Sequence, residues 1–413
     1  MLFLRMNYLK KAPLWSLFFL LAWVSFPAVK ASSQSAIASA HPLATEAGMR
    51  ILQQGGNAFD AAVTVSAVLG VVEPYSSGFG GGGFWLLHRA ADNRQVMLDG
   101  RERAPLAAHR DMYLNSDGEV IKGASIDGAL AAGIPGMPAA LVHLAEHYGQ
   151  MPLAVTLQPA IDIARDGFAV DDYYRKMAGW RLPALQSSLS ASEIFLQQDQ
   201  LPETGFIIRQ PDLAKTLMRL ANRGIGGFYQ GETAQKLVAA VRAAGGIWSL
   251  RDLAEYRVSE RQPVKFRYRD KTIISAALPS SGGIVLAQIF NMLDGFDLDK
   301  LDDAGRLHVV VEAMRRAYRD RAKYLGDSDY VDVPVAKLVS REHASQLASD
   351  IQLDKASVSQ ADQVKPEGQD TTHFSILDSE GNRVSATLSI NYPFGSGFVA
   401  AGTGILLNDE MDD

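Results

Sequence analysis

The six residues Asp370-Thr-Thr-His-Phe-Ser375 mark the point where a polar connector, Lys365 to Asp370, gives way to alternating polar and apolar residues. Alternation with a period of two is typical of a half-buried strand, so a loop is expected to enter a strand at Thr371. A turn at residues 379–382 joins this strand to a second one, Arg383 to Ile390. The sequence therefore predicts a β-hairpin with Thr371 at its open end.

Two registers are open for this hairpin. Symmetric closure of the turn pairs Asp378 with Arg383, and therefore Thr372 with Ser389. A bulge of one residue pairs Thr371 with Ser389 instead. In both registers a second hydroxyl lies close to that of Thr371.

Thr371 is a candidate nucleophile. An alcohol attacks poorly at neutral pH unless a base lies beside it. If the hydroxyl attacked the carbonyl of Asp370, water would hydrolyse the resulting ester and Thr371 would become a chain start. Its free α-amine, with an ordinary pKa of about 7.7–8.0, would then supply the base. We therefore expect self-cleavage between Asp370 and Thr371.

Seven short motifs, taken together, resemble the γ-glutamyltranspeptidase family of N-terminal-nucleophile hydrolases. The resemblance extends over nearly all of residues 36–413, with the motifs in the family's order. They are Gly55-Gly-Asn-Ala-Phe-Asp-Ala-Ala62, Gly80-Gly-Gly-Gly-Phe84, Asp99-Gly-Arg-Glu102, Pro279-Ser-Ser-Gly-Gly283, Thr371-Thr-His-Phe-Ser375, Ser389-Ile-Asn391 and Gly404-Ile-Leu-Leu-Asn-Asp-Glu-Met-Asp-Asp413.

The resemblance implies an α+β fold, a four-layer αββα sandwich, made as one precursor. Residues 32–370 would form the large subunit and residues 371–413 the start of the small, catalytic subunit, and the two would associate after cleavage. Family members continue well past Asp413. We therefore expect this chain to be a truncated precursor with an incomplete sandwich, inactive by itself.

The same resemblance assigns roles to residues near the hairpin. Thr371 matches the catalytic nucleophile, and Ser389 matches a second catalytic hydroxyl that is threonine in many relatives. Asn391 matches the asparagine that lines the glutamyl pocket.

Charged residues at two places are candidates for substrate binding. Arg101 follows a predicted strand, where a guanidinium can grip a carboxylate through two hydrogen bonds or serve in a surface ion pair. Residues 408–413 carry four carboxylates, which could bind calcium or an ammonium group. The resemblance favours binding of the substrate's α-carboxylate by Arg101 and of its α-amine by Glu410 and Asp413.

The activity implied is that of a hydrolase and acyltransferase without cofactor or metal. Thr371 would attack glutathione or another γ-glutamyl amide, and the γ-glutamyl group would pass to water, an amino acid or a dipeptide. Two alternatives stay open. A related acylase would take a glutaryl or cephalosporin side chain, which lacks the α-amine, and a truncated chain could be an inactive scaffold.

Composition excludes several other classes. The 413 residues are 47% hydrophobic and carry a net charge of −6, which gives no basic footprint for nucleic acid. The absence of cysteine excludes disulfides and thiolate chemistry. The glycine-rich run at 78–83 lacks a phosphate-binding signature, and His143 with His147 lacks the glutamate of a zinc protease helix.

The first residues have the layout of a secretory signal peptide. Basic residues precede an apolar run from Leu14 to Val24, and small residues follow near Ala31. We expect removal of residues 1–31 and a periplasmic or secreted protein. An uncleaved membrane anchor is the alternative.

Helical patterns fill most of the rest. The sequence predicts helices at Pro42–Gln54 and, wholly buried, at 58–72, and several more between 133 and 256. A long helix from Asp303 to about Leu325 is expected to bury one apolar stripe and to expose four arginines. The stripe is Leu307, Val310, Val311, Met314, Ala317 and Tyr318, and the arginines are Arg315, Arg316, Arg319 and Arg321.

Overall fold

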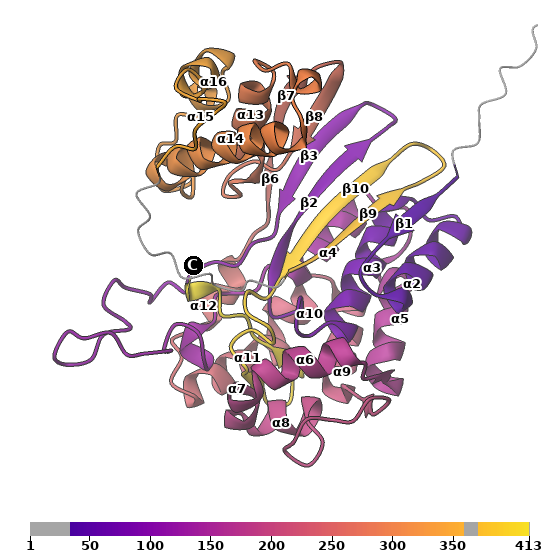
Figure 1. Ribbon diagram of the computed structural model, residues 1–413. Coiled ribbons are helices and arrows are strands. Elements are labelled where there is room, and N and C mark those ends of the chain that lie inside the picture. The colour runs from indigo at the N-terminus through magenta and orange to yellow at the C-terminus, as the bar shows by residue number, and fades with distance from the viewer. Residues whose placement is uncertain (1–33, 359–370, 413) are drawn as a thin grey trace, which may run out of the picture.

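A computed structural model describes residues 34–358 and 371–412. Its central feature is a six-stranded sheet in which every neighbouring pair is antiparallel (Figure 1). The strands follow the order β1 (Ala36–Ala38), β9 (Thr371–Leu377), β10 (Arg383–Ser389), β2 (Gly82–Arg89), β3 (Arg94–Asp99) and β6 (Ser259–Arg261). The strand that begins at Thr371 therefore lies inside the sheet.

The predicted hairpin is present, and its register is the one that pairs Thr371 with Ser389. Pairing ends at Leu377 and Arg383, so five residues rather than four form the turn. The side chain of Asp378 fixes this longer turn, because its Oδ1 accepts hydrogen bonds from the backbone N–H groups of Glu380 and Asn382, each at 2.9 Å.

Helices cover one face of the sheet. Helix α3 (Ala58–Val72) packs against β9 and β10, and all of its residues are buried, as its nearly uniform apolar sequence predicts. The Asn57 side chain caps its first turn. Helix α2 (Pro42–Gln53) packs on α3 and β1, and α5 (Leu153–Asp166) packs on the outer side of α3.

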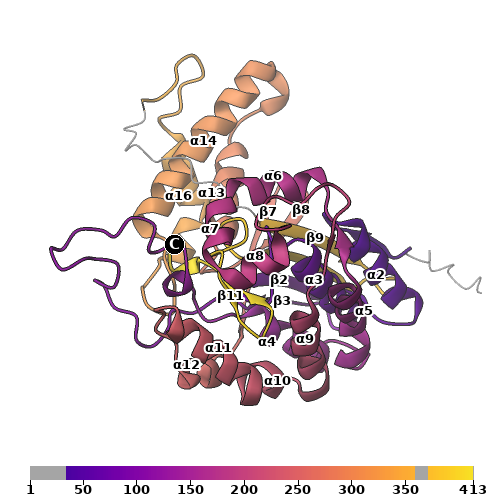
Figure 2. The same ribbon diagram turned by 90° about the horizontal axis from the view of Figure 1, so that it is seen from below.

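The predicted helical region between residues 133 and 256 is present, and its helices α9 to α12 lie together (Figure 2). Two short strand pairs accompany it, β4 (Phe168–Ala169) with β5 (Ile207–Ile208) and β11 (Val399–Ala400) with β12 (Ile405–Leu406). The helices are α4 (Met137–His147), α6 (Asp172–Trp180), α7 (Leu182–Ser187), α8 (Leu189–Phe195), α9 (Pro211–Arg223), α10 (Gly226–Tyr229), α11 (Gly231–Ala243) and α12 (Leu250–Glu255).

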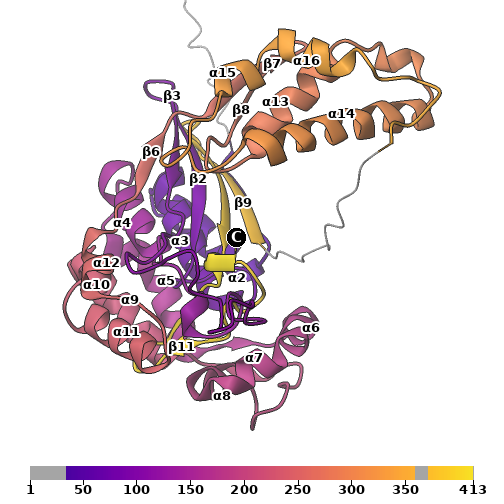
Figure 3. The same cartoon turned by 90° about the vertical axis from the view of Figure 1, so that its left-hand side faces the viewer.

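A region from residue 264 to 348 projects from the sheet and has its own apolar core (Figure 3). It contains the hairpin β7 (Val264–Tyr268) and β8 (Lys271–Ser275), which packs on α13. Its helices are α13 (Gly282–Leu293), α14 (Asp303–Tyr324), α15 (Val335–Leu338) and α16 (Arg341–Ala348).

The expected orientation of α14 is wrong. Of the predicted stripe, Leu307, Val311, Met314 and Tyr318 are exposed, while the buried face carries Glu312, Arg316 and Asp320 among small apolar residues. Charge pairing makes that burial possible: Arg316 donates to Glu312 at 2.6 Å and to Asp350 at 2.7 Å. Arg316 is thus buried, although four solvated arginines were expected.

The α+β class is confirmed. Within the described ranges, one sheet of more than two strands is present and helices cover one of its faces, which corresponds to one half of the expected four-layer sandwich. The other face presents Thr371, His373 and Ser375, whose side chains are exposed.

Several expectations lie outside the described residues: the signal peptide at 1–31, Asp370 on one side of the expected cleavage point, and Asp413. In the part of the chain that the structure covers, no helix is both long and apolar enough to span a bilayer.

Candidate active site

Thr371 and Ser389 face each other across the end of the β9–β10 hairpin. Thr371 is the first residue of β9, Ser389 is the last of β10, and the two are register partners. Ser389 Oγ accepts a hydrogen bond of 2.9 Å from the backbone N–H of Asn391, so its own proton is left to donate. The two hydroxyl-bearing residues predicted as catalytic therefore lie side by side.

A run of glycines lets β2 lie close to this pair. Gly82 is the register partner of Ser389, and a Cβ atom on Gly81 would collide with the carbonyl oxygen of Ser389. A Cβ on Gly82 would lie 2.6 Å from Glu102 Oε2. The glycines at residues 80–83 thus allow neighbouring backbone segments to approach closely.

The side chain of Thr372 is buried on the face of the sheet opposite Thr371. Thr372 lies beside Glu73, the last residue before Pro74 at the end of α3. Burial raises the pKa of Glu73 to about 7; the Thr372 hydroxyl opposes this rise and Asp171 adds to it. Sequence analysis missed Glu73, although an acid at the end of an almost wholly apolar, buried helix was a signal.

Arg181, between α6 and α7, stabilises the turn after β10. Its guanidinium donates to the carbonyl oxygens of Pro393 at 3.1 Å and Gly395 at 2.7 Å, and pairs with Asp127. Asn391 adopts a left-handed conformation with φ of 70°, and its side chain donates to the carbonyl of Asp409 at 3.1 Å. Asn391 therefore joins the end of β10 to residues 409–412, the acidic segment.

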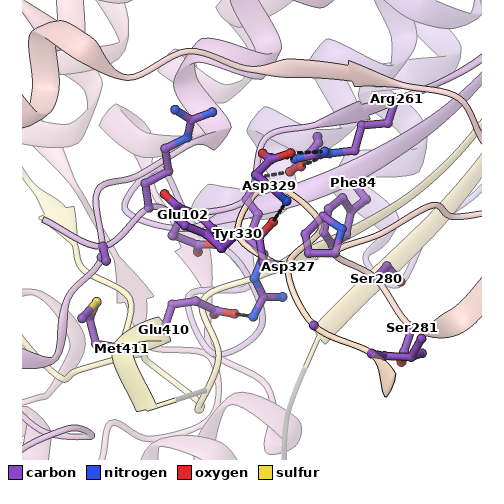
Figure 4. A pocket seen from close by; sticks show the side chains of 18 of the residues that line it. Phe84, Glu102, Arg261, Ser280, Ser281, Asp327, Asp329, Tyr330, Glu410 and Met411 are labelled. Atoms are coloured by element: carbon purple, nitrogen blue, oxygen red, sulfur yellow. Dashed lines mark hydrogen bonds and ion pairs between the residues drawn. The ribbon is translucent and has the colours of Figure 1, made fainter. Parts of the chain in front are cut away.

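Arg101 and Glu410 meet in a cavity of about 1130 Å³ (Figure 4). Their side chains form an ion pair, and Glu102 lies beside them with Oε1 lacking a hydrogen-bond partner among the described residues. Burial holds the pKa of Glu102 well above its usual range, and the Glu410 carboxylate raises it further. At this point of the cavity, the Arg101 guanidinium therefore lies beside two carboxyl groups, those of Glu102 and Glu410.

The cavity extends from these residues to the start of α13. Pro279, Ser280 and Ser281 line it there, so this motif shares the cavity with Arg101 and Glu410. Thr371, Ser389 and Asn391 are not among the described residues that line it. The predicted site therefore falls into two parts in this structure, the hydroxyl pair and the charged cavity.

The carboxylates of residues 409–412 point to different partners. Asp409 accepts from the backbone N–H of Tyr392 at 3.0 Å, and burial raises its pKa to about 8. Glu410 pairs with Arg101, and Asp412 accepts from Ser125. Across residues 34–358 and 371–412, no group of three or more His, Asp or Glu side chains is arranged to hold a metal ion.

Comparison with known proteins gives one consistent result. The family profile described as Gamma-glutamyltranspeptidase matches residues 44–413. A glutathione hydrolase proenzyme of Pseudomonas sp. (strain A14) is 42% identical over 385 residues, which cover 91% of this chain and 66% of the relative. The chain thus spans about two thirds of the length of this curated relative.

Two solved structures share the fold. The γ-glutamyltranspeptidase of Helicobacter pylori is 39% identical, with a TM-score of 0.76 over 80% of this chain and 94% of that chain. The cephalosporin acylase of Bacillus halodurans is 28% identical, with a TM-score of 0.79 over 92% of this chain and 69% of that chain.

Proposed function

The chain belongs to the γ-glutamyltranspeptidase family, and from this premise we propose that the whole gene product is a self-cleaving enzyme that hydrolyses or transfers γ-glutamyl groups. Glutathione and other γ-glutamyl amides are the proposed donors, because similar proteins bear the name glutathione hydrolase. Water, an amino acid or a dipeptide is the proposed acceptor.

The observation that carries this proposal is the meeting of Arg101 and Glu410 in one cavity. A γ-glutamyl group ends in an α-carboxylate and an α-ammonium. Arg101 would bind the carboxylate through two charge-assisted hydrogen bonds, and Glu410 would bind the ammonium, with Asp413 as its partner. On binding, the ion pair between Arg101 and Glu410 would be replaced by two ion pairs with the ligand, so that no charge is left without a partner.

Cleavage prepares the nucleophile. The Thr371 hydroxyl attacks the carbonyl carbon of Asp370, the peptide C–N bond breaks, and water hydrolyses the ester to leave a free α-amine on Thr371. Residues 32–370 and 371–413 then belong to two associated subunits.

The freed α-amine takes the proton of the Thr371 hydroxyl as its oxygen attacks the γ-carbonyl of the donor. The proton passes to the departing amine, and a γ-glutamyl ester remains on Thr371. Attack on this ester by water releases glutamate, and attack by an amine forms a new γ-glutamyl amide. Ser389, opposite Thr371, can donate its hydroxyl proton to the reacting oxygen.

The location of the protein is part of the proposal. The apolar run from Leu14 to Val24, between basic and small residues, supports a removable leader at 1–31 and a periplasmic or secreted enzyme.

The decisive variant is Thr371→Ala in the full-length gene product. We expect a single uncut chain with no release of glutamate from glutathione, because both the nucleophile and the new amine are lost. Thr371→Ser, which keeps a hydroxyl, is the matched control and should still be cut. An active or cut alanine variant would refute the mechanism.

An acylase acting on glutaryl amides is the second candidate, since a cephalosporin acylase shares the fold. Glu410 beside Arg101 favours a substrate that carries an amine. Comparing kcat/KM for γ-glutamyl and glutaryl amides separates the two, and a preference for the glutaryl amide would favour the acylase.

A further inference from the structure

Asn408 lies immediately before the acidic segment, and its side chain is fully buried. Its Nδ2 donates to the carbonyl oxygens of Gly80 at 2.6 Å and Gly133 at 2.8 Å. Its Oδ1 accepts from the backbone N–H groups of Gly133 at 2.9 Å and Glu410 at 3.0 Å. These four bonds use the full hydrogen-bonding capacity of an asparagine side chain.

One of the three segments that Asn408 joins leads to the hydroxyl pair. The backbone N–H of Asn408 also donates to Gly80 at 3.2 Å, and Gly80 forms a parallel bridge with Leu407. Two residues later, Gly82 is the partner of Ser389 in the sheet, and Ser389 is the partner of Thr371. Asn408 therefore ties the acidic segment to β2, the strand that pairs with the β9–β10 hairpin.

The second segment leads to Arg101. A Cβ on Gly133 would lie 3.2 Å from the Cβ of Glu102, and Ile134 exchanges backbone hydrogen bonds with Arg103. Gly133 is thus packed against the loop that carries Arg101. Because Asn408 binds Gly133 through both its N–H and its carbonyl, it fixes this loop relative to Glu410.

We propose that Asn408 is a positioning residue that sets the separation of Arg101 and Glu410, and so gives the cavity its preference for a head group with both an α-carboxylate and an α-amine. It acts through the backbone N–H of Glu410 and contacts no substrate. The inference rests on the proposed function for the identity of that head group.

Other side chains do not reproduce these contacts. Alanine would leave the Gly80 and Gly133 carbonyls and the Gly133 and Glu410 N–H groups without their partner in a buried place, which is costly. Aspartate would turn an oxygen instead of an N–H group toward two carbonyl oxygens. Serine can make part of the set.

The test compares two ligands that differ only in the α-amine, glutamate and glutarate, by calorimetric binding to the full-length gene product. In Asn408→Ala we expect the ratio of the glutamate to the glutarate affinity to fall about tenfold, the effect of weakening one charged contact. In Asn408→Ser this ratio should fall less. The serine variant serves as the test if the alanine variant does not fold.

Asn382 provides a matched control. It is also buried and hydrogen-bonded, to Asp378 and to the N–H of Ala90. It lies in the turn of the β9–β10 hairpin, at the end opposite Thr371 and Ser389. Asn382→Ala should lower the melting temperature and leave the affinity ratio unchanged.

Two results overturn the inference and are distinguishable. If the wild-type protein prefers glutamate and the Asn408 variants keep that preference, the role of Asn408 is refuted while the proposed function stands. If the wild-type protein binds glutamate no better than glutarate, the head-group assignment itself fails, and this inference fails with it.

Discussion

Arg101 and Glu410 satisfy each other's charge within the protein, so neither side chain is a buried, uncompensated ion. A ligand that carries a carboxylate and an ammonium can replace that pair without leaving a charge alone. A ligand with only one of the two groups cannot, which is the physical basis of the specificity that we propose.

Arg101→Lys tests this balance. Lysine keeps the charge but loses the planar pair of donors, so we expect KM for a γ-glutamyl amide to rise about ten- to a hundredfold with a smaller change in kcat. The control is Arg110→Lys, at an exposed arginine. An unchanged KM in Arg101→Lys would show that the guanidinium does not bind the substrate.

Glu73 should give the fold a pH dependence. Its pKa is raised from 4.5 to about 7 by burial, so the fold favours the protonated form. The stabilisation is fully present below about pH 4.5 and is lost as the pH rises through about 7, a change of up to about 3 kcal/mol.

Glu73→Gln removes that titration. We expect the free energy of unfolding of the wild-type protein to fall between about pH 5 and about pH 8. In Glu73→Gln this fall should be smaller by about 2–3 kcal/mol. Denaturant titrations at the two pH values measure it. The exposed Glu119→Gln is the control, and equal pH dependence in all three proteins would contradict the assignment.

At the scale of elements, the sequence predicted what local pattern and capping determine. The hairpin, the buried helix α3 and the helical region followed from periodicity and from helix start and stop signals. The face that α14 buries did not, because ion pairs with distant residues such as Asp350 place Arg316 inside. Long-range partners of this kind leave no local pattern.

The candidate site divides in the same way. Thr371, Ser389, Arg101 and Glu410 lie in short motifs and were predicted from them. The supporting roles of Asn408, which lies in one of these motifs, and of Arg181 were not predicted. Their partners are backbone groups as distant as Gly80 and Gly395, and any sequence can supply a backbone group. Only the folded chain shows which ones they bind.

The turn of the β9–β10 hairpin depends on Asp378. Its Oδ2 also accepts from the N–H of Ala58 at 2.9 Å, which ties the turn to the first turn of α3. Asp378→Asn loses charge-assisted bonds, so the free energy of unfolding should fall by about 1–3 kcal/mol. Asp270→Asn, in the exposed β7–β8 turn, should leave the free energy of unfolding nearly unchanged, and equal effects of the two substitutions would contradict the role of Asp378.

At the scale of the whole molecule, Arg261 connects the projecting region to the sheet. It donates to Asp99 at the end of β3 at 2.7 Å and forms two hydrogen bonds with Asp329, at 2.9 and 2.7 Å. Asp329 lines the cavity with Arg101 and Glu410. This side chain therefore holds one wall of the cavity against the sheet.

Arg261→Gln should loosen that wall without unfolding the sheet. Breaking both ion pairs should speed amide hydrogen exchange in residues 264–348 about tenfold or more and leave β9 and β10 unchanged. Arg89→Lys, at an exposed pair with Asp92, is the control. Exchange that rises equally in the sheet would show that Arg261 supports the whole fold instead.

The central claim is that an internal threonine becomes a chain start whose own amine activates its hydroxyl. Mass and amino-terminal analysis of the purified full-length gene product tests it most directly. The account predicts two fragments that separate between Asp370 and Thr371, the second beginning with Thr371. A single uncut chain, or a break at any other bond, would contradict it.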